Sequence, residues 1–328
     1  MSKKLYIRYM VKDEKIKTLI KVAKLYYLGH MTQQEIADML DTSRSTIARM
    51  LIEAERKKIV RIEISDTYFD FEQASEEIKK AYGLQFVEIV PSSTNISSTR
   101  LTMGEVATSH LNSYIKENSR IGLSWGNNIS AFVSAYHSKK TYPHAKVVQM
   151  VGGFYNSINY MDGHDLARKL ADKMGCEFSC LQAPMFVSNE ELRDLMLQEE
   201  DTKAHFELME QIDIAVMSIG FADYSETPSF YEKYLDEKSA KEINSRGLCN
   251  ICGHQIDMYG NEPETSLSKR HIGISLETIR KIPMVIGMCN GNNKTAAILS
   301  VINGGYINGL IIDEVAAIPL LHVEGIEL

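Results

Sequence analysis

Residues 25–64 read LYYLGHMTQQEIADMLDTSRSTIARMLIEAERKKIVRIEI, a pattern of two short helices at a fixed offset followed by a β-ribbon. Thr32 can accept from the free amides of a first turn, while Glu35 reaches back to it, as in a capping box. The apolar stripe that follows comprises Ile36, Ala37, Met39 and Leu40. The spacing predicts a short, half-buried helix that begins after Thr32.

A second helix is expected after the turn Asp41-Thr42, with Ser43 as its cap. Its apolar members recur at helical spacing and are Ile47, Met50, Leu51 and Ala54. The side chains left facing outward are Arg44, Ser45, Thr46 and Arg49. Short donors and arginines at a helix N-terminus suit the major groove of DNA, where a guanidinium can pair with a guanine edge. The pattern therefore predicts a helix-turn-helix whose second helix contacts bases.

Val60 to Ile64 then alternates apolar and polar residues, which predicts a wing strand carrying Arg61 past DNA phosphates. Thr32, Gln33 and Ser43 at the helix starts complete the expected DNA-binding set. The alternative is an ordinary helical hairpin with a solvated polar face. The distribution of charge favours the DNA-binding interpretation. Residues 1–65 hold 14 Lys+Arg against 8 Asp+Glu, whereas the remaining residues hold 22 Lys+Arg against 35 Asp+Glu. Only this basic head is expected to meet a polyanion, as double-stranded operator DNA.

Composition limits the classes of protein to which this chain can belong. No stretch approaches the eighteen apolar residues of a membrane span, and the N-terminus lacks the apolar core of a signal peptide, so we expect a cytoplasmic protein with no membrane partner. Five cysteines fit a reducing compartment. Cys249 and Cys252, with His254 close by, leave a zinc site or a redox pair as alternatives, but the spacings favour buried thiols. We therefore expect no metal and no cofactor.

The body alternates short apolar runs with helical patterns. The runs are FVEIV, RIGLS, AKVVQMV, EFSCL, IDIAVMSIG, MVIGMC and GLIIDEV, and helices are expected over 99–116, 129–137, 163–173 and 189–209. Near-continuous apolar strands between helices predict an α/β, doubly wound parallel sheet. We divide the chain into a winged helix-turn-helix DNA-binding domain (1–65), a helical linker (66–82), which can also pair with its copy in a second subunit, and an effector domain (83–328).

In such sheets ligands lie outside the carboxyl ends of the strands, where glycine-containing loops lead into helices. The expected effector-binding residues on these loops are Ser124, Gly126, Asn127, Asn128, Gly152, Gly220 and Lys294. Lys294, in the first turn of a helix, is locally unfavourable unless an anion also binds, which predicts a phosphate contact. Asp223 and Asp313 could accept from sugar hydroxyls, although Asp313 could equally cap the following segment. Each loop taken singly could be an ordinary connection between a strand and a helix, with no ligand.

The chain resembles SorC-type sugar-sensing transcriptional regulators, a family that includes central glycolytic and deoxyribonucleoside regulators of Gram-positive bacteria. The resemblance covers nearly the whole chain and rests on YYLGHMTQQEIADMLDTSRSTIARML, GLSWGNNI, VVQMVGG, DIAVMSIG and GNNKTAAILSVINGGYINGLIIDEVAA. It implies a DNA-binding head on a Rossmann-like domain of the sugar-phosphate isomerase type, assembled as a homodimer or homotetramer. It also implies that Ser124, Gly126, Asn127, Asn128 and Lys294 hold the phosphate of a sugar-phosphate effector.

Three positions depart from that family pattern. Asn127-Asn128 replaces two threonines, Val151 stands where several relatives have a basic residue, and Cys249-Asn250 replaces a glycine and an aspartate, with Asn250 at a common effector contact. These departures leave an unphosphorylated polyol open as the effector.

The sequence as a whole predicts a regulator of a carbohydrate-utilisation operon, a repressor released by its inducer, with an activator as the alternative. The rival class is an isomerase or deaminase that uses Asp223 or Asp313 as base and Lys294 for phosphate. The sequence has no carboxylate pair or His-carboxylate spacing that indicates proton abstraction, so we predict no catalytic residues. A redox or metal sensor is the third alternative.

Overall fold

The structure is a computed structural model that describes residues 3–7, 14–27, 29, 31–57, 59–64, 69–153, 162–221, 241 and 249–326. It divides into two compact units, Met1–Phe69 and Asp70–Leu328. Within the described part of the chain, no helix is both long and apolar enough to cross a membrane.

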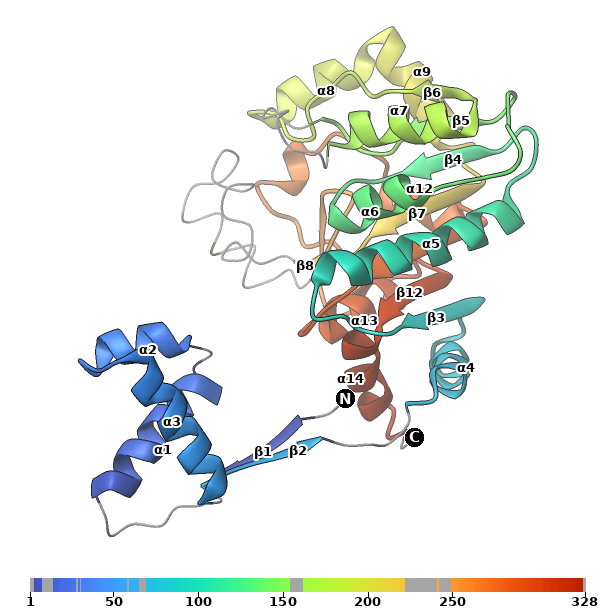
Figure 1. The fold of residues 1–328 in the computed structure, drawn as a ribbon. Helices are drawn as coiled ribbons and strands as arrows, with labels where there is room; N and C mark the ends of the chain where they lie inside the picture. Colours follow the sequence, from blue (N-terminus) through green and yellow to red (C-terminus); the bar gives the residue numbers. More distant parts are fainter. Residues whose placement is uncertain are drawn as a thin grey trace. The chain divides into compact units, whose positions relative to one another are not determined.

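The described part of the first unit holds three helices, α1 (Glu14–Tyr27), α2 (Gln33–Met39) and α3 (Arg44–Arg56) (Figure 1). Thr32 and Glu35 form the predicted capping box, with Glu35 N donating to Thr32 Oγ1 at 3.2 Å and Thr32 N donating to Glu35 Oε2 at 2.7 Å. Ser43 caps α3, since its Oγ accepts from Thr46 N at 3.2 Å. Both helix starts of the helix-turn-helix thus follow from local hydrogen bonding, as predicted.

The three helices share a small core. Its fully or largely buried members are Val22, Ile36, Ala37, Ile47 and Leu51. Met39 was expected in this stripe but is 56% exposed, because α2 ends there and only two of its side chains are buried.

The wing is a two-stranded antiparallel sheet of β1 (Lys3–Ile7) and β2 (Val60–Ile64). The predicted strand is present, but its partner comes from the very start of the chain. Ile7 pairs with Val60 and Lys3 with Ile64.

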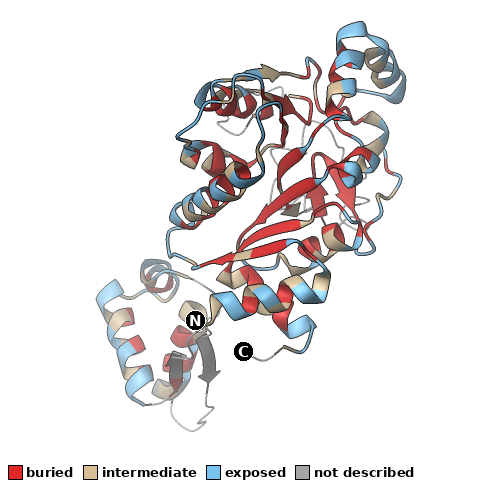
Figure 2. Ribbon diagram, turned by 90° about the vertical axis from the view of Figure 1, so that its right-hand side faces the viewer, coloured by how far each residue is buried: buried red, intermediate tan, exposed pale blue. Residues whose placement is uncertain are grey.

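The second unit is built on a seven-stranded parallel sheet in the order β3-β12-β11-β7-β4-β5-β6. The strands are β3 (Phe86–Val90), β4 (Arg120–Leu123), β5 (Lys146–Gln149), β6 (Glu177–Ser179), β7 (Ile214–Ser218), β11 (Met284–Cys289) and β12 (Gly309–Asp313). β11 and β12 are buried at every position, and Figure 2 shows the large sheet buried between helices. This is the doubly wound α/β architecture that the apolar runs predict.

Among the described residues, the helices of the second unit are α4 (Phe71–Tyr82), α5 (Ile96–Tyr114), α6 (Asn127–Ala135), α7 (Gly163–Met174), α8 (Glu190–Gln198), α9 (Glu200–Met209), α12 (Leu276–Lys281), α13 (Thr295–Asn303) and α14 (Glu314–Val323), with a short 3₁₀ turn at Ser268–Arg270. The single helix expected over 189–209 is two helices, because Glu199 adopts an extended conformation between them.

α4 coincides with the segment for which we expected a linking role. It packs within the second unit, where Ala74 and Ile78 are completely buried and Gly83 ends the helix in the left-handed conformation. The helix therefore packs as part of the second unit, close to the point where the chain enters it.

A second, smaller sheet was not predicted from the sequence. It is antiparallel in the order β10-β9-β8, from β8 (Gly220–Phe221), β9 (Cys249–Ile251) and β10 (His254–Ile256). A tight turn at Cys252-Gly253, with φ of 50° and 90°, joins β9 to β10.

Candidate functional site

The strand order of the large sheet reverses between β4 and β7. β4 is followed by β5 and β6 on one side, whereas β7 is followed by β11 and β12 on the other. In open parallel sheets a crevice forms at the carboxyl ends of such a pair, and ligands bind there. The topology therefore predicts a ligand site at the loops that follow β4 and β7.

A cavity of about 340 Å³ lies at this point, a size typical of small-molecule sites. Its lining residues are Arg100, Ser124, Trp125, Gly126, Asn127, Asn128, Ser218, Ile219, Gly220, Phe221, Asn250, Cys252, Asn290 and Lys294. We call it the switch-point pocket. It brings together seven of the ten residues predicted from the sequence to bind an effector.

The loop after β4 is held to the last residue of β7 at the wall of this pocket. Ser124 Oγ accepts a hydrogen bond from Ser218 N at 3.1 Å, which fixes the buried hydroxyl. Gly126 has φ of 113°, and a Cβ there would lie 3.5 Å from the Ser218 side chain. This backbone conformation favours glycine, and it turns the chain into α6 so that the first amides of the helix are directed to the pocket.

Three buried asparagines in the pocket each have one polar atom without a hydrogen-bond partner among the described residues. They are Asn128 Oδ1, Asn250 Nδ2 and Asn290 Nδ2, on side chains that are 6%, 8% and 8% exposed. Leaving a buried polar atom unpaired costs about 1–3 kcal/mol, so such groups are normally satisfied by a ligand or water. One acceptor and two donors together match a hydroxylated ligand.

Two cations line the same pocket. Lys294 immediately precedes α13, and its Nζ lies 5.3 Å from the ring centroid of Phe221. Arg100, on α5, donates from Nε to Asn290 Oδ1 at 3.4 Å, and burial lowers the pKa of its guanidinium. The sequence analysis did not identify Arg100. The available signal was its position five residues into the helix that follows β3, at the same edge of the sheet.

Three predicted effector contacts are not among the residues that line the pocket. Asp313 is 4% exposed, and its Oδ1 accepts from Ala316 N at 3.1 Å and from Gly291 N at 3.0 Å, so it caps α14 and holds the loop after β11. Gly152 packs against a neighbouring segment, where a Cβ would lie 2.6 Å from Met185 N. Asp223 falls outside the described residues.

The predicted DNA-reading side chains lie on or beside α3. Ser43, Arg44, Ser45 and Arg49 are exposed, while Thr46 is half-buried. Arg49 Nε donates only weakly within the helix, to Ser45 O at 3.4 Å. Thr32 is exposed and Gln33 half-buried at the start of α2. The side chain of Arg61 is outside the described part of the structure, although its backbone pairs with Tyr6.

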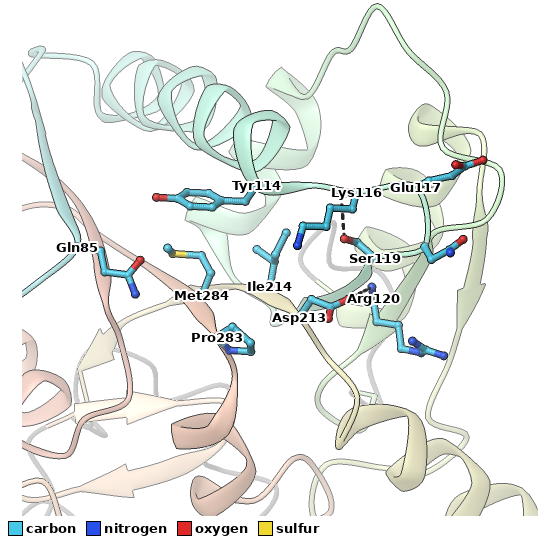
Figure 3. Close-up of a pocket in the computed structure, with 11 residues that line it drawn as sticks. Gln85, Tyr114, Lys116, Glu117, Ser119, Arg120, Asp213, Ile214, Pro283 and Met284 are labelled. Atoms are coloured by element: carbon cyan, nitrogen blue, oxygen red, sulfur yellow. Dashed lines mark hydrogen bonds between the residues drawn. The ribbon is translucent and has the colours of Figure 1, made fainter.

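A larger cavity, about 580 Å³, lies at the opposite edge, where β3, β4, β7 and β11 begin (Figure 3). Two hydrogen bonds join its lining residues: Arg120 N donates to Asp213 Oδ2 at 2.8 Å, and Lys116 N donates to Ser119 Oγ at 3.0 Å. None of its described lining residues has a buried side-chain polar atom without a partner. The switch-point pocket is smaller, but it has the buried, unpaired polar atoms that a ligand would satisfy.

Cys249 and Cys252 are buried free thiols. Burial raises the pKa of Cys252 to about 12, which suppresses the thiolate that redox or metal chemistry needs. Within the described ranges, no three His, Cys, Asp or Glu side chains gather as metal ligands.

The chain matches one family model and is similar to several known regulators. Residues 66–322 match the "Sugar-bind" family model, a sugar-binding domain. The chain is 25% identical over 310 residues to the deoxyribonucleoside regulator of Bacillus subtilis, covering 94% of this chain and 98% of that protein. It is also 25% identical over 315 residues to the sorbitol operon regulator of Klebsiella pneumoniae, covering 95% and 100%.

Solved structures agree on the fold. The full-length sorbitol operon regulator SorC from Klebsiella pneumoniae superposes with a TM-score of 0.72 at 24% identity, over 94% of this chain and 100% of that one. A transcriptional regulator from Streptococcus pneumoniae gives a TM-score of 0.72 at 26% identity, over 78% and 98%. With the family domain spanning most of its length, the chain belongs to the SorC family of sugar-binding transcriptional regulators.

Proposed function

We propose that this protein regulates a carbohydrate-utilisation operon by binding operator DNA through its first unit, under the control of a sugar or sugar phosphate in the switch-point pocket. The observation that carries the proposal is the convergence of unpaired amide atoms and two cations in one pocket of a chain that also has a helix-turn-helix. In this assignment residues 1–65 bind DNA, residues 66–82 connect, and residues 83–328 sense the effector.

On the DNA side, Arg44, Ser45, Thr46 and Arg49 enter the major groove from the N-terminal half of α3. Arg49 is the best-suited base contact, because it is exposed and makes only a 3.4 Å bond within its own helix. Thr32, Gln33, Ser43 and Arg61 contact the phosphate backbone. A two-fold operator requires two such helices, so the active form is a homodimer or homotetramer.

On the effector side, the asparagine amides suit sugar hydroxyls, because each amide can both donate and accept. Asn128, Asn250 and Asn290 would satisfy their remaining polar atoms on the ligand. Ser124, Gly126, Asn127, Gly220 and Lys294 complete the contact set. The names of two relatives, a sorbitol operon regulator and a deoxyribonucleoside regulator, make sorbitol, deoxyribose and their phosphates the first probes.

Effector binding can alter operator affinity only if the ligand prefers one of the two states. We propose that the effector favours the DNA-incompetent state, so that the protein is a repressor released by inducer. An activator would show the opposite sign in the same assay.

The rival function is sugar-phosphate isomerisation or deamination. Proton abstraction needs a carboxylate or imidazole within reach of the substrate. No Asp, Glu or His is among the described lining residues of the pocket, and Asp313 is occupied in two backbone hydrogen bonds. This observation favours a binding function over catalysis.

The test is fluorescence anisotropy of the full-length protein on labelled duplex from the region upstream of its own gene. Each probe is added at half-saturating operator occupancy, where both release and tighter binding can be measured. Release by one carbohydrate, with no product formed from it, supports a repressor, whereas tighter binding supports an activator. Turnover of a sugar phosphate by the purified protein would overturn the non-enzymatic assignment.

A further inference from the structure

Arg100 lies beside the N-terminus of α6 although it belongs to another helix. Four residues further along α5, Gly104 packs directly on α6, where a Cβ would lie 2.8 Å from Ala131 O and 2.9 Å from Phe132 Cα. Both helices start at the carboxyl edge of the sheet. One helical turn back from that contact is therefore Arg100 on α5 and Asn127-Asn128 on α6.

A guanidinium at that place is electrostatically unfavourable by itself, since the N-terminus of a helix carries partial positive charge. Arg100 is half-buried, and burial lowers the pKa of its guanidinium. No carboxylate among the described residues forms an ion pair with it, and its one hydrogen bond uses Nε. The two terminal nitrogens are left with four N–H donors for something else.

Asn290 holds Arg100 in this position and adds to the excess of donors. Its Oδ1 accepts from Arg100 Nε, while its own Nδ2 is buried and unpaired in the described structure. Asn290 also begins the loop that carries Lys294. The guanidinium nitrogens, the Asn290 amide and the first amides of α6 therefore approach the same corner of the pocket from three elements. A tetrahedral oxyanion accepts hydrogen bonds from several directions, so it fits this corner better than a planar carboxylate does.

We propose that Arg100 is a specificity-determining residue: with the α6 N-terminus and Asn290 it forms an anion subsite that selects a phosphorylated effector over its neutral counterpart. The proposal rests on the proposed function. It deepens that function by assigning the discrimination between phosphorylated and neutral effectors to a residue on α5.

Trp125 is the single tryptophan of the chain and lines this pocket, so its fluorescence reports on binding there. The full-length protein is titrated with inorganic phosphate, with acetate, and with sorbitol and sorbitol 6-phosphate. The variants are Arg100→Gln, which removes the charge, Arg100→Lys, which keeps it without the fork, and Arg168→Gln as a control. Arg168 is an exposed arginine that pairs with Asp165 and Asp172 on α7.

Phosphate is expected to bind the wild type and Arg168→Gln equally, and acetate is expected to bind neither. Arg100→Gln should weaken phosphate binding about ten- to hundredfold, the loss typical of a charge-assisted hydrogen bond, and Arg100→Lys should weaken it less. Sorbitol binding, where present, should be unchanged by Arg100→Gln. This last reading separates an anion contact from a general packing role.

Each contrary result has a separate meaning. Equal phosphate affinity in wild type and Arg100→Gln would refute the role of Arg100 while leaving the proposed function intact. The same holds if phosphate does not bind while sorbitol does, or if acetate binds as well as phosphate. Failure of both sorbitol and sorbitol 6-phosphate to alter Trp125 fluorescence, while phosphate still binds through Arg100, would weaken the carbohydrate assignment alone.

Discussion

Arg100 Nε donates to Asn290 Oδ1 at 3.4 Å, and this contact joins residues 190 positions apart in the chain. It links α5 to the loop between β11 and α13 at the wall of the switch-point pocket. Ser218 N donates to Ser124 Oγ and makes a second link, between the end of β7 and the loop after β4. The pocket is therefore assembled from elements that are distant in sequence, and three of its buried amide atoms have no hydrogen-bond partner in the part of the chain that the structure describes.

Replacing Asn250 by alanine should affect ligand binding more than stability. Its side-chain Nδ2 is buried and has no hydrogen-bond partner among the described residues, so removing the amide relieves a desolvation penalty. We expect Asn250→Ala to leave the melting temperature of the ligand-free protein unchanged or higher. Effector affinity should fall about tenfold, the equivalent of about 1.4 kcal/mol for one lost hydrogen bond. Destabilisation of the free protein without any loss of effector affinity would show that Asn250 is structural.

Replacing Arg49 by alanine should reduce sequence discrimination. A bidentate guanidinium-base pair is worth about 1–3 kcal/mol, so specific operator affinity should fall about ten- to hundredfold while binding to random duplex changes little. The matched variant is Arg56→Ala, at the exposed C-terminal end of the same helix. It should weaken specific and random binding alike. Anisotropy on both duplexes distinguishes the two patterns, and identical behaviour of the two variants would mean that α3 is not the reading helix.

The capping box should govern the opening of α2. Thr32→Ala removes the side-chain acceptor for Glu35 N and should cost about 1 kcal/mol, which corresponds to about fivefold faster hydrogen exchange of the α2 amides. Thr32→Ser keeps the hydroxyl and should exchange at the wild-type rate. If the alanine and serine variants exchange alike, the cap contributes nothing measurable.

The stabilisation of α2 by Glu35, the second member of the capping box, should depend on pH. Hydrogen bonds from the backbone and side chain of Thr32 hold the pKa of Glu35 below its ordinary value of 4.5. A depressed carboxyl pKa stabilises the fold above the unfolded-state value, and this contribution is lost as pH falls through the folded-state pKa. The exchange protection of α2 should therefore decline below about pH 4.5 in the wild type. Glu35→Gln should lack that decline, and an unchanged pH profile in this variant would exclude Glu35 as its source.

The second unit should lose stability on mild acidification for a different reason. Burial, with His254 adding to it, holds the pKa of His271 well below its ordinary value of 6.5, and burial lowers that of His205 too. The unfolded chain then binds more protons, so stability is complete above about pH 6.5 and falls below it, by up to about 1.4 kcal/mol per histidine per pH unit. Urea unfolding followed by Trp125 fluorescence should give a lower midpoint at pH 5.5 than at pH 7.5.

His271→Gln should reduce this difference between the two pH values, whereas His144→Gln should not, because the His144 side chain is 65% exposed. A midpoint that does not change between pH 7.5 and pH 5.5 would contradict a neutral, buried His271.

Local patterns predicted much of this structure because they act over a few residues. The caps at Thr32 and Ser43, the helix-turn-helix and the parallel strands followed from spacing alone. Long-range partners did not. The β1 strand pairs across more than fifty residues with β2, and no local signal marks that pairing. Arg100 reaches the pocket only through the packing of α5 on α6, and the small β8-β9-β10 sheet depends on a turn at Cys252, a residue that rarely adopts positive φ.

For two features the sequence left two alternatives open, and only the structure distinguishes between them. Asp313 could have faced a ligand or capped a helix, and its two backbone donors show the cap. The cysteine pair could have been reactive, but complete burial makes both thiols packing residues. The deciding factors, hydrogen-bond partners for Asp313 and burial for the two cysteines, depend on tertiary packing, which no spacing in the sequence specifies.

The most direct test of ligand-gated DNA binding is the operator dissociation constant of the full-length protein, with and without its effector, in the wild type and in Lys294→Gln. Coupling between the two sites predicts an effector-induced change of about 5- to 150-fold in the wild type. Lys294→Gln should bind operator normally without effector and respond much less to it. An operator affinity that no carbohydrate changes, or a Lys294→Gln protein that responds like the wild type, would contradict the account.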